Sequence, residues 1–328
     1  MSLHKVLIAD YLQESSVETP VLAGLAEIEM AMARSEAELA SHVADAEVMI
    51  VFHDIPMLTA ATFDRAPKCV GIVRAGVGYN NVDREAAGQR GIVVCNVPDY
   101  GTEEVADHAI MLLLAVNRRL VDCDASMRRG EWELRPILNS PRLRGRCLGI
   151  VGCGRIGTAT ALRAKAFGLD VVFYDPYKPD GLDKALGLRR VTTLQELLSQ
   201  ADFVSLHCYL DAHSLHLINA QAFQAMKPGA ILINTARGPV VDQRALIEAL
   251  ESGHLGGAGI DVFEHEPPQD ARLLQHPRVT LTPHVAFYAL EGYEEMRRKS
   301  AEEARRILLG EPPRNPVNLD HLVPRRSP

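Results

Sequence analysis

The stretch LGIVGCGRIG, residues 148–157, decides the fold that we expect for this chain. Gly152, Gly154 and Gly157 form a G-x-G-x-x-G pattern that follows an apolar strand and opens a helix. A second strand, DVVFY, is followed by Asp175, eighteen residues after Gly157. A strand, a glycine turn, a helix, a second strand and an acidic residue in this order indicate a dinucleotide-binding βαβ unit.

Each residue of this pattern has a physical reason. Gly152 permits a tight turn, Gly154 lets the backbone approach a pyrophosphate, and Gly157 lets the helix pack closely on the strand. The helix N-terminus offers N–H groups and a positive dipole end to the phosphates. Asp175 can accept hydrogen bonds from both ribose hydroxyls and would repel a 2′-phosphate, which favours NAD over NADP. The alternative is a glycine turn in an ordinary βαβ unit.

Outward from this stretch, short apolar strands alternate with helical patterns, which predicts an α/β fold. The strands before it are KVLIA, EVMIVF, CVGIV and GIVVCNV, and those from it onward are RCLGIV, DVVFYD, DFVSLH, AILINT, GAGIDV and VTLTPH. A long apolar helix, TEEVADHAIMLLLAVNRRL, lies between the two series, with Thr102 as its cap and Arg118 and Arg119 in its last turn. A charged amphipathic helix from Phe287 to about Leu309 returns to the first unit.

Length and composition set bounds on the function. The chain has 328 residues, 47% apolar and 23% charged, and a net charge of −7, which suggests two globular domains and argues against nucleic acid or an anionic membrane as a partner. The six cysteines form no C-x-x-C pair, and neither a signal peptide nor an apolar run of about 20 residues is visible. We therefore expect reduced thiols and a cytoplasmic protein.

The segment HCYLDAHSLH contains His207, His213 and His216. It lacks the H-E-x-x-H pattern and convincing zinc-ligand spacing, so we expect no metal site. The favoured interpretation is a loop beside the cofactor that carries surface histidines.

Charged and titratable residues follow three consecutive strands of the second unit. Arg237 follows AILINT, Asp261 ends GAGI with Glu266 five residues later, and His284 follows VTLT. Because ligands bind beyond the carboxyl ends of strands in a doubly wound sheet, these residues are expected at one edge.

Their chemistry suits a reaction on a small acid. Arg237 can hold a carboxylate with two donors, and His284 can transfer a proton near neutral pH. A contact with Glu266 would orient the imidazole and favour its protonated form. Taken singly, each residue has a simpler explanation: a surface charge, a loop residue or the start of a turn.

The loop VRAGVGYNNVD in the first unit offers a second anion site. Gly76 and Gly78 free the backbone, so that successive N–H groups can form a nest, and Arg74 adds positive charge. If this loop faces Arg237, both domains would hold one carboxylate. A glycine turn with a surface arginine is an equally good interpretation of this loop alone.

These motifs resemble a known family. GCGRIG, FYDPY, NTARGPVVD, GIDVFEHEP and TPH, between about Val70 and Asn318, are similar to the D-isomer-specific 2-hydroxyacid dehydrogenases. FYDPYKPDG, LRAKAFG and HLIN are most similar to the C-terminal-binding-protein subgroup, whose animal members serve as NAD-sensing corepressors. The chain departs from the family's pattern at Tyr209, often proline, and from the subgroup's at Phe287, where tryptophan is usual. Glu266 stands where a formate dehydrogenase would have glutamine.

The resemblance implies roles for individual residues. Arg237 would bind the substrate carboxylate and carbonyl, His284 would be the acid–base, and Glu266 its partner. The cofactor would be NAD, and the residues expected to bind it are Gly152, Gly154, Arg155, Ile156, Gly157, Asp175, His207, Thr235, Ala236 and Asp261. The substrate would contact Arg74, Gly76, Val77 and Gly78.

The resemblance also implies a fold and an assembly. A Rossmann-type doubly wound parallel sheet would occupy residues 102–286, and residues 1–101 and 287–328 would form a smaller, discontinuous flavodoxin-like substrate domain. We expect a homodimer formed through the long helix and the arm after it.

The expected activity is NAD-dependent interconversion of a D-2-hydroxy acid and its 2-oxo acid, with hydride transfer and acid–base catalysis by histidine. The alternative is an NAD-sensing, dimeric, corepressor-like binding protein with weak or no dehydrogenase activity. The printed sequence ends with PVNLDHLVPRRSP, which we take as an argument against the extended tail that we associate with this alternative.

Overall fold

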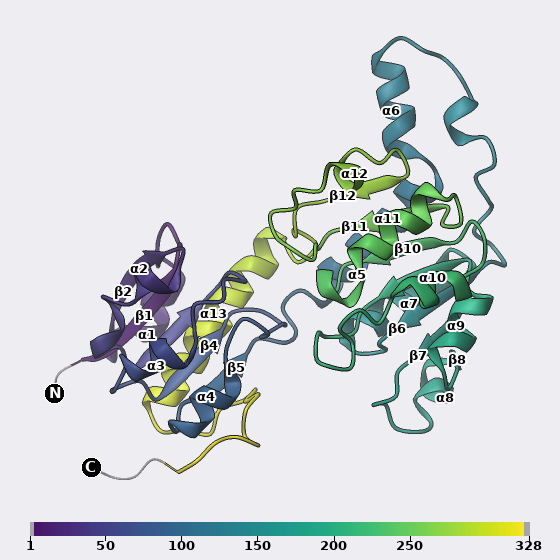
Figure 1. The fold of residues 1–328 in the computed structure, drawn as a ribbon. Helices are drawn as coiled ribbons and strands as arrows, with labels where there is room; N and C mark the ends of the chain where they lie inside the picture. The colour runs from purple at the N-terminus through teal and green to yellow at the C-terminus, as the bar shows by residue number, and fades with distance from the viewer. Residues whose placement is uncertain (1–2, 325–328) are drawn as a thin grey trace. The chain divides into compact units, whose positions relative to one another are not determined.

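The chain divides into two compact units. The computed structural model describes residues 3–324, and unit 1 comprises Met1–Gly101 and Ala289–Pro328 while unit 2 comprises Thr102–Tyr288. The sequence predicted that the second unit ends at residue 286, whereas unit 2 ends at Tyr288. Figure 1 shows a parallel sheet flanked by helices in each unit.

Unit 2 is built on a seven-stranded parallel sheet in the order β12-β11-β10-β9-β6-β7-β8. The strands are β6 (Cys147–Val151), β7 (Asp170–Tyr174), β8 (Arg189–Arg190), β9 (Phe203–Leu206), β10 (Ile231–Asn234), β11 (Gly257–Ile260) and β12 (Val279–Leu281). The order reverses between β6 and β9, which is the topological switch point of a doubly wound sheet. The predicted Rossmann-type fold is thus confirmed.

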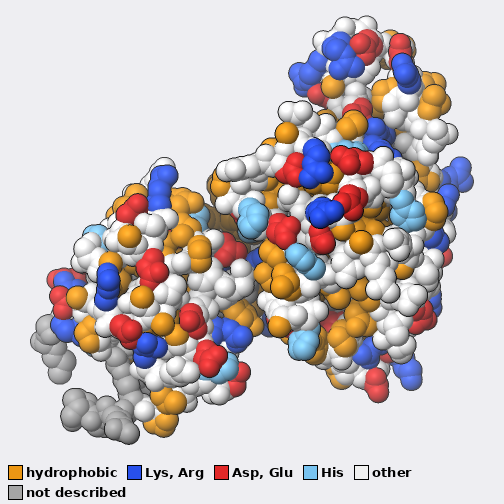
Figure 2. Space-filling model, viewed as in Figure 1, with side chains coloured by type: hydrophobic (Ala, Val, Ile, Leu, Met, Phe, Trp, Pro, Cys, Tyr) orange, Lys and Arg blue, Asp and Glu red, His pale blue; other side chains and the backbone are white. Residues whose placement is uncertain are grey.

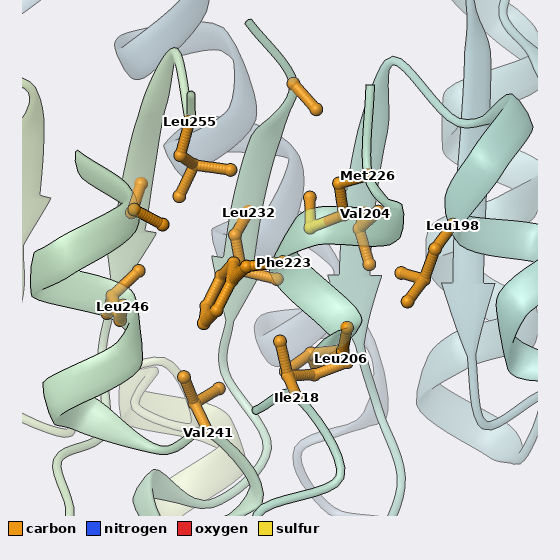
Figure 3. Packing of buried hydrophobic residues seen from close by; sticks show 14 of the residues in the cluster. Leu198, Val204, Leu206, Ile218, Phe223, Met226, Leu232, Val241, Leu246 and Leu255 are labelled. Atoms are coloured by element: carbon orange, nitrogen blue, oxygen red, sulfur yellow. The ribbon is translucent and has the colours of Figure 1, made fainter. Parts of the chain in front are cut away.

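Helices cover both faces of this sheet. One face packs against α5 (Thr102–Asn117), α7 (Arg155–Ala166) and α8 (Leu182–Leu186). The other packs against α9 (Leu194–Gln200), α10 (Ala220–Ala225), α11 (Gln243–Glu251) and α12 (Ala271–Leu274). In Figure 3, Phe223 of α10 lies beside Leu232 of β10, and Leu246 of α11 belongs to the same cluster. Because both faces are covered, the central strands are mostly apolar, and most of their polar side chains lie at or near the strand ends.

Unit 1 has a five-stranded parallel sheet in the order β2-β1-β3-β4-β5, which is the flavodoxin-like order. Its strands are β1 (His4–Asp10), β2 (Ala26–Ala33), β3 (Val48–Val51), β4 (Gly71–Arg74) and β5 (Val93–Asn96). Core side chains of α2 (Glu36–Leu39), α3 (Ala60–Asp64) and α4 (Arg84–Gln89) form one cluster with it. The helices α1 (Glu18–Leu22) and α13 (Leu290–Leu308) pack against each other, and α13 also packs on β3 and β4. The flavodoxin-like fold that the sequence predicted for the smaller, discontinuous domain is confirmed.

Two strands were not predicted from the sequence, and both lie at sheet edges. In β2, glutamates alternate with apolar residues and the strand is mostly exposed, while β8 consists of two arginines. A search for continuous apolar runs finds buried strands and overlooks such edges.

The long helix also differs from the prediction at both ends. Thr102 is itself the first helical residue, and its buried hydroxyl finds no hydrogen-bond partner among the described residues, so it does not cap the helix. The helix ends at Asn117, because Arg119 takes a left-handed conformation with φ 51°. A separate helix, α6 (Leu120–Arg128), follows, and the loop after it contains one 3-10 turn, Arg135–Ile137.

Candidate active site

The predicted catalytic residues lie at one edge of the unit 2 sheet. The strands β10, β11 and β12 are parallel neighbours, with Ile260 paired to both Asn234 and Leu281. The chain leaving these strands carries Arg237, Glu266 and His284, so parallel pairing brings segments far apart in sequence to one place.

His284 and Glu266 are in direct contact, as the sequence suggested. Nδ1 of His284 lies 2.7 Å from Oε2 of Glu266, and the backbone N–H of Phe263 donates to Oε1 at 3.0 Å. Since Nδ1 is taken by the carboxylate, the orientation of the ring is fixed and Nε2 is the nitrogen available to a substrate.

The charge of Glu266 is maintained by its surroundings. Burial raises the pKa of this carboxyl, but the hydrogen bond and charge of His284, the Phe263 N–H and the charge of Arg237 outweigh burial, so its pKa lies below the usual value. Arg237 is therefore within electrostatic reach of the pair. The site combines a guanidinium, an imidazole and an ionised carboxylate.

Asp261 shapes the loop that presents His284. This carboxylate is fully buried and accepts hydrogen bonds from the hydroxyl of Thr282 at 2.6 Å and from the N–H groups of Val285 and Ala286 at 3.0 and 3.1 Å. His284 takes a left-handed φ of 55°, and its N–H donates to the carbonyl of Asp261 at 2.8 Å. Such a conformation costs on the order of 1 kcal/mol outside glycine and persists where surrounding contacts impose it.

Of two adjacent polar residues on α5, one contacts this loop and the other contacts α7. Nε2 of His108 lies 2.9 Å from the hydroxyl of Thr282, whereas Asp107 pairs with Arg163 at 2.5 Å. These two neighbours on the helix therefore have different partners, because adjacent helical residues point in different directions. Burial lowers the pKa of His108, although the charge of Asp261 opposes this effect.

The turn at Arg237 explains why a glycine stands next to an arginine. The side-chain amide of Asn234 donates to the carbonyl of Arg237 at 3.0 Å and its oxygen accepts from the N–H of Ala236 at 3.0 Å. A Cβ at Gly238 would lie 1.8 Å from the carbonyl oxygen of Phe263, so no larger residue fits. The segments that carry Arg237 and Glu266 are thus in backbone contact. No role for Gly238 was predicted from the sequence, although its place directly after Arg237 was a signal.

The glycine turn of residues 152–157 has the geometry expected for a phosphate site. A Cβ at Gly152 would lie 2.6 Å from the Cys208 nitrogen, and one at Gly157 would lie 2.0 Å from the Gly152 carbonyl oxygen. A Cβ at Gly154 would meet nothing within 4 Å, so open space adjoins the backbone there. The helix α7 begins at Arg155 without a side-chain cap, and Arg155 is exposed beside a half-buried Ile156. These N–H groups suit an anion.

Further polar groups fit a nucleotide at the same edge. The oxygens of Asp175 accept from the N–H groups of Cys153 and Tyr177 at 2.9 and 3.0 Å, which leaves further lone pairs for ribose hydroxyls. Among the described residues, Nδ1 of His207 and the hydroxyl of Thr235 are buried without a hydrogen-bond partner. Buried polar atoms without partners are rare and are suited to a ligand. The residues present therefore fit the dinucleotide.

The histidine loop differs from the sequence interpretation. His207 is no surface histidine, because Nδ1 is buried and Nε2 lies 2.8 Å from the hydroxyl of Ser205. His213 is exposed, and His216 lies 2.6 Å from Glu264. Within the part of the chain that the structure describes, no cluster of three or more histidine, cysteine or acidic side chains could hold a metal ion.

The predicted substrate loop lies in unit 1, after β4. Arg74 is buried and its Nη1 donates to the carbonyl of Ala75 at 2.6 Å. The carbonyl of Gly76 accepts from the N–H of Val97 at 3.0 Å, and that of Val77 from the Asn96 amide at 2.7 Å. Val77 and Gly78 are partly exposed. The expected position of this loop opposite Arg237 stays a prediction.

Residues 110–286 match the family described as "D-isomer specific 2-hydroxyacid dehydrogenase, NAD binding domain". The chain is 41% identical over 290 residues to a glyoxylate reductase of Korarchaeum cryptofilum, covering 87% of each. It is 37% identical over 318 residues to a D-3-phosphoglycerate dehydrogenase of Methanocaldococcus jannaschii, which covers 97% of this chain but only 60% of that relative.

Among solved structures, the chain resembles an NADPH-dependent glyoxylate/hydroxypyruvate reductase of Sinorhizobium meliloti in complex with NADP and malonate. The identity is 32%, the TM-score is 0.87, and 99% of this chain and 100% of the other are covered. No helix in residues 3–324 has the length and apolar character needed to cross a membrane.

The glycine turn generates a paired prediction. Gly154→Ala should leave the thermal unfolding midpoint unchanged, because its Cβ enters open space, yet weaken NADH binding at least about tenfold by obstructing the phosphates. Gly157→Ala should lower the midpoint by about 3–8 °C through its clash with the Gly152 carbonyl. Calorimetry measures the unfolding midpoints, and a fluorescence titration with NADH measures the binding affinities. Wild-type affinity in Gly154→Ala would show that no phosphate lies there.

His207 generates a pH prediction. Burial lowers the pKa of His207 to about 3. The unfolded chain binds this proton below about pH 6.5, so stability is lost as the pH falls from 6.5 toward 3. In His207→Asn, the loss of unfolding free energy between pH 7.5 and pH 5 should be smaller by on the order of 1–2 kcal/mol, measured by urea unfolding. The exposed His213→Asn is the control and should behave as wild type. Equal pH dependence in all three proteins would refute the assignment.

Proposed function

The chain belongs to the D-isomer-specific 2-hydroxyacid dehydrogenase family, and on this premise we propose that it interconverts a D-2-hydroxy acid and its 2-oxo acid with NAD. The observation that carries the proposal is the hydrogen-bonded pair of His284 and Glu266, 2.7 Å apart, with the charge of Arg237 acting on it. A proton carrier beside an anion-binding group is what reduction of a 2-oxo acid requires.

We assign the chemical roles as follows. The dinucleotide, when bound, supplies or accepts the reducing equivalent. Arg237 holds the substrate carboxylate and polarises the carbonyl with its fork of donors. His284 gives a proton from Nε2 to the carbonyl oxygen during reduction and takes it back during oxidation. Glu266 stays ionised, holds Nδ1 and stabilises the protonated ring.

The choice of NAD over NADP rests on Asp175. Its carboxylate is held at the end of β7 by the Cys153 and Tyr177 N–H groups, and a 2′-phosphate there would meet a negative charge. The Sinorhizobium relative is called NADPH-dependent, so preference is a property of the individual chain. The further cofactor contacts proposed are those of Arg155, Ile156, His207, Thr235, Ala236 and Asp261.

The division of labour between the units is also part of the proposal. Unit 2 would bind the dinucleotide, and the loop of Arg74, Gly76, Val77 and Gly78 in unit 1 would bind the substrate. The cytoplasmic location and the C-terminal-binding-protein subgroup stay predictions from the sequence. The relatives above are named as a dehydrogenase and reductases, which favours catalysis over the corepressor-like alternative.

We further propose that the chain forms a homodimer through the long helix α5 and the arm after it, which begins with α6. In Figure 1, α6 projects from the rest of unit 2, and Figure 2 shows hydrophobic side chains among charged ones on this projection. Trp132, Leu134 and Leu138 are 87%, 75% and 64% exposed. Apolar residues gathered on a projection are typical of an interface.

Activity tests the proposal directly. The wild type should oxidise NADH with at least one member of a panel of 2-oxo acids. His284→Ala should lower kcat by about 10²–10⁴-fold with NADH affinity unchanged, because it removes only the proton carrier. Glu266→Gln should lower kcat with NADH affinity unchanged, because Nδ1 of His284 loses its charged partner. Negligible turnover of every acid by the wild type, with NAD still bound and promoting dimers, would favour the corepressor-like alternative; full activity in His284→Ala would refute the mechanism.

Sedimentation equilibrium tests the dimer. Trp132→Glu should raise the dimer dissociation constant at least about tenfold, because it places a charge in an apolar interface. NADH affinity should not change. Leu319→Glu, at an exposed leucine of unit 1, is the control and should sediment as wild type. A monomeric wild type would contradict the proposal.

A further inference from the structure

A second histidine–glutamate pair lies close to the catalytic pair. Nε2 of His216 lies 2.6 Å from Oε1 of Glu264, two residues before Glu266. We name these two side chains the clasp, residues 237–243 the Arg237 turn, and residues 263–266 the Glu266 turn. Neither member of the clasp has a role in the proposed reaction so far.

The clasp closes across the Arg237 turn. On one side, the N–H groups of His216 and Ile218 donate to the carbonyls of Pro239 and Val240 at 2.8 and 3.0 Å. On the other side, Oε2 of Glu264 accepts from the N–H of Gln243 at 3.3 Å. Ile218 and Val241 also form a β-bridge, and their side chains belong to the hydrophobic core drawn in Figure 3. The Arg237 turn is therefore held from both sides.

The same pair is linked to Glu266. A Cβ on Gly238 would lie 2.5 Å from the Glu264 nitrogen, so the Arg237 turn and the Glu266 turn touch at the residue that carries the clasp carboxylate. Phe263, the preceding residue, donates its N–H to Oε1 of Glu266. A movement of Glu264 would thus shift Gly238 and the hydrogen bond that holds Glu266.

The backbone at His216 is strained, with a left-handed φ of 50°. This conformation is uncommon outside glycine, and strained residues that persist are frequent where position is critical. The side chains of the clasp are 41% and 25% exposed, and a pair this exposed contributes little to global stability. We therefore ascribe the strained backbone at His216 to a local role in positioning the neighbouring turns.

We propose that the clasp of His216 and Glu264 is a positioning element: it holds the Arg237 turn against the Glu266 turn and so sets the separation between the guanidinium and the imidazole–carboxylate pair. The inference rests on the proposed function. Neither residue touches the substrate. Their effect is on the alignment of groups that do, and misplacement by about 1 Å can cost up to about 10²-fold in rate.

Steady-state kinetics on the full chain test the positioning role. Glu264→Ala should lower kcat for the 2-oxo acid about tenfold, with NADH affinity by fluorescence within about twofold of wild type. His216→Ala should lose as much, and the double variant should lose no more than either. Glu264→Gln, which keeps an acceptor for His216 and Gln243, should recover most of kcat. The control is Glu248→Ala, which removes the exposed α11 pair with Arg244 and should keep full activity.

Hydrogen exchange tests the structural role of the clasp without relying on the proposed enzymatic activity. In Glu264→Ala, backbone exchange should accelerate in residues 237–243 and 263–266 and remain unchanged in Glu248→Ala. An inactive wild type would refute the proposed function and the positioning role with it, and exchange would still show whether the clasp holds the turns. Unchanged exchange, unchanged kcat, or a loss of NADH affinity equal to the loss of kcat would each overturn the proposal.

Discussion

Parallel pairing of β10, β11 and β12 is the constraint on which the chemistry of unit 2 depends. Neighbouring parallel strands end at the same edge, so Arg237, Asp261 and His284 leave the sheet side by side although 47 positions separate the first from the last. The glycine turn after β6 lies at the same edge of the sheet. One sheet thus carries both the glycine turn that fits a dinucleotide and the residues that we propose as the catalytic groups.

Strand ends alone do not place side chains accurately, and the loops beyond them are held by buried polar contacts. Asp261 holds the loop of His284 in a left-handed conformation, and Asn234 folds the turn of Arg237. The absence of a side chain at Gly238 lets this turn touch Phe263. These contacts are all made within unit 2, and they fix the loops that carry Arg237 and His284.

The fold could be predicted, and the candidate site residues could be singled out, because their signals are local. Apolar runs mark buried strands, and the glycine pattern with Asp175 marks the dinucleotide turn. Arg237, Glu266 and His284 stand out as charges at strand ends. The edge strands β2 and β8 could not be found in this way, because exposed strands carry polar residues. The contacts of His216 with Glu264, or of His108 with Thr282, depend on loop conformations that no sequence spacing encodes.

A crystal structure of the full chain with NAD and oxamate, a 2-oxo acid analogue that is not reduced, would test most directly whether these strand ends form one catalytic centre. We expect the guanidinium of Arg237 to bind the oxamate carboxylate and Nε2 of His284 to lie about 3 Å from its carbonyl oxygen, with Glu266 still on Nδ1. Oxamate bound away from Arg237, or an imidazole separated from both Glu266 and the carbonyl, would contradict the assignment of this edge as the site of reaction.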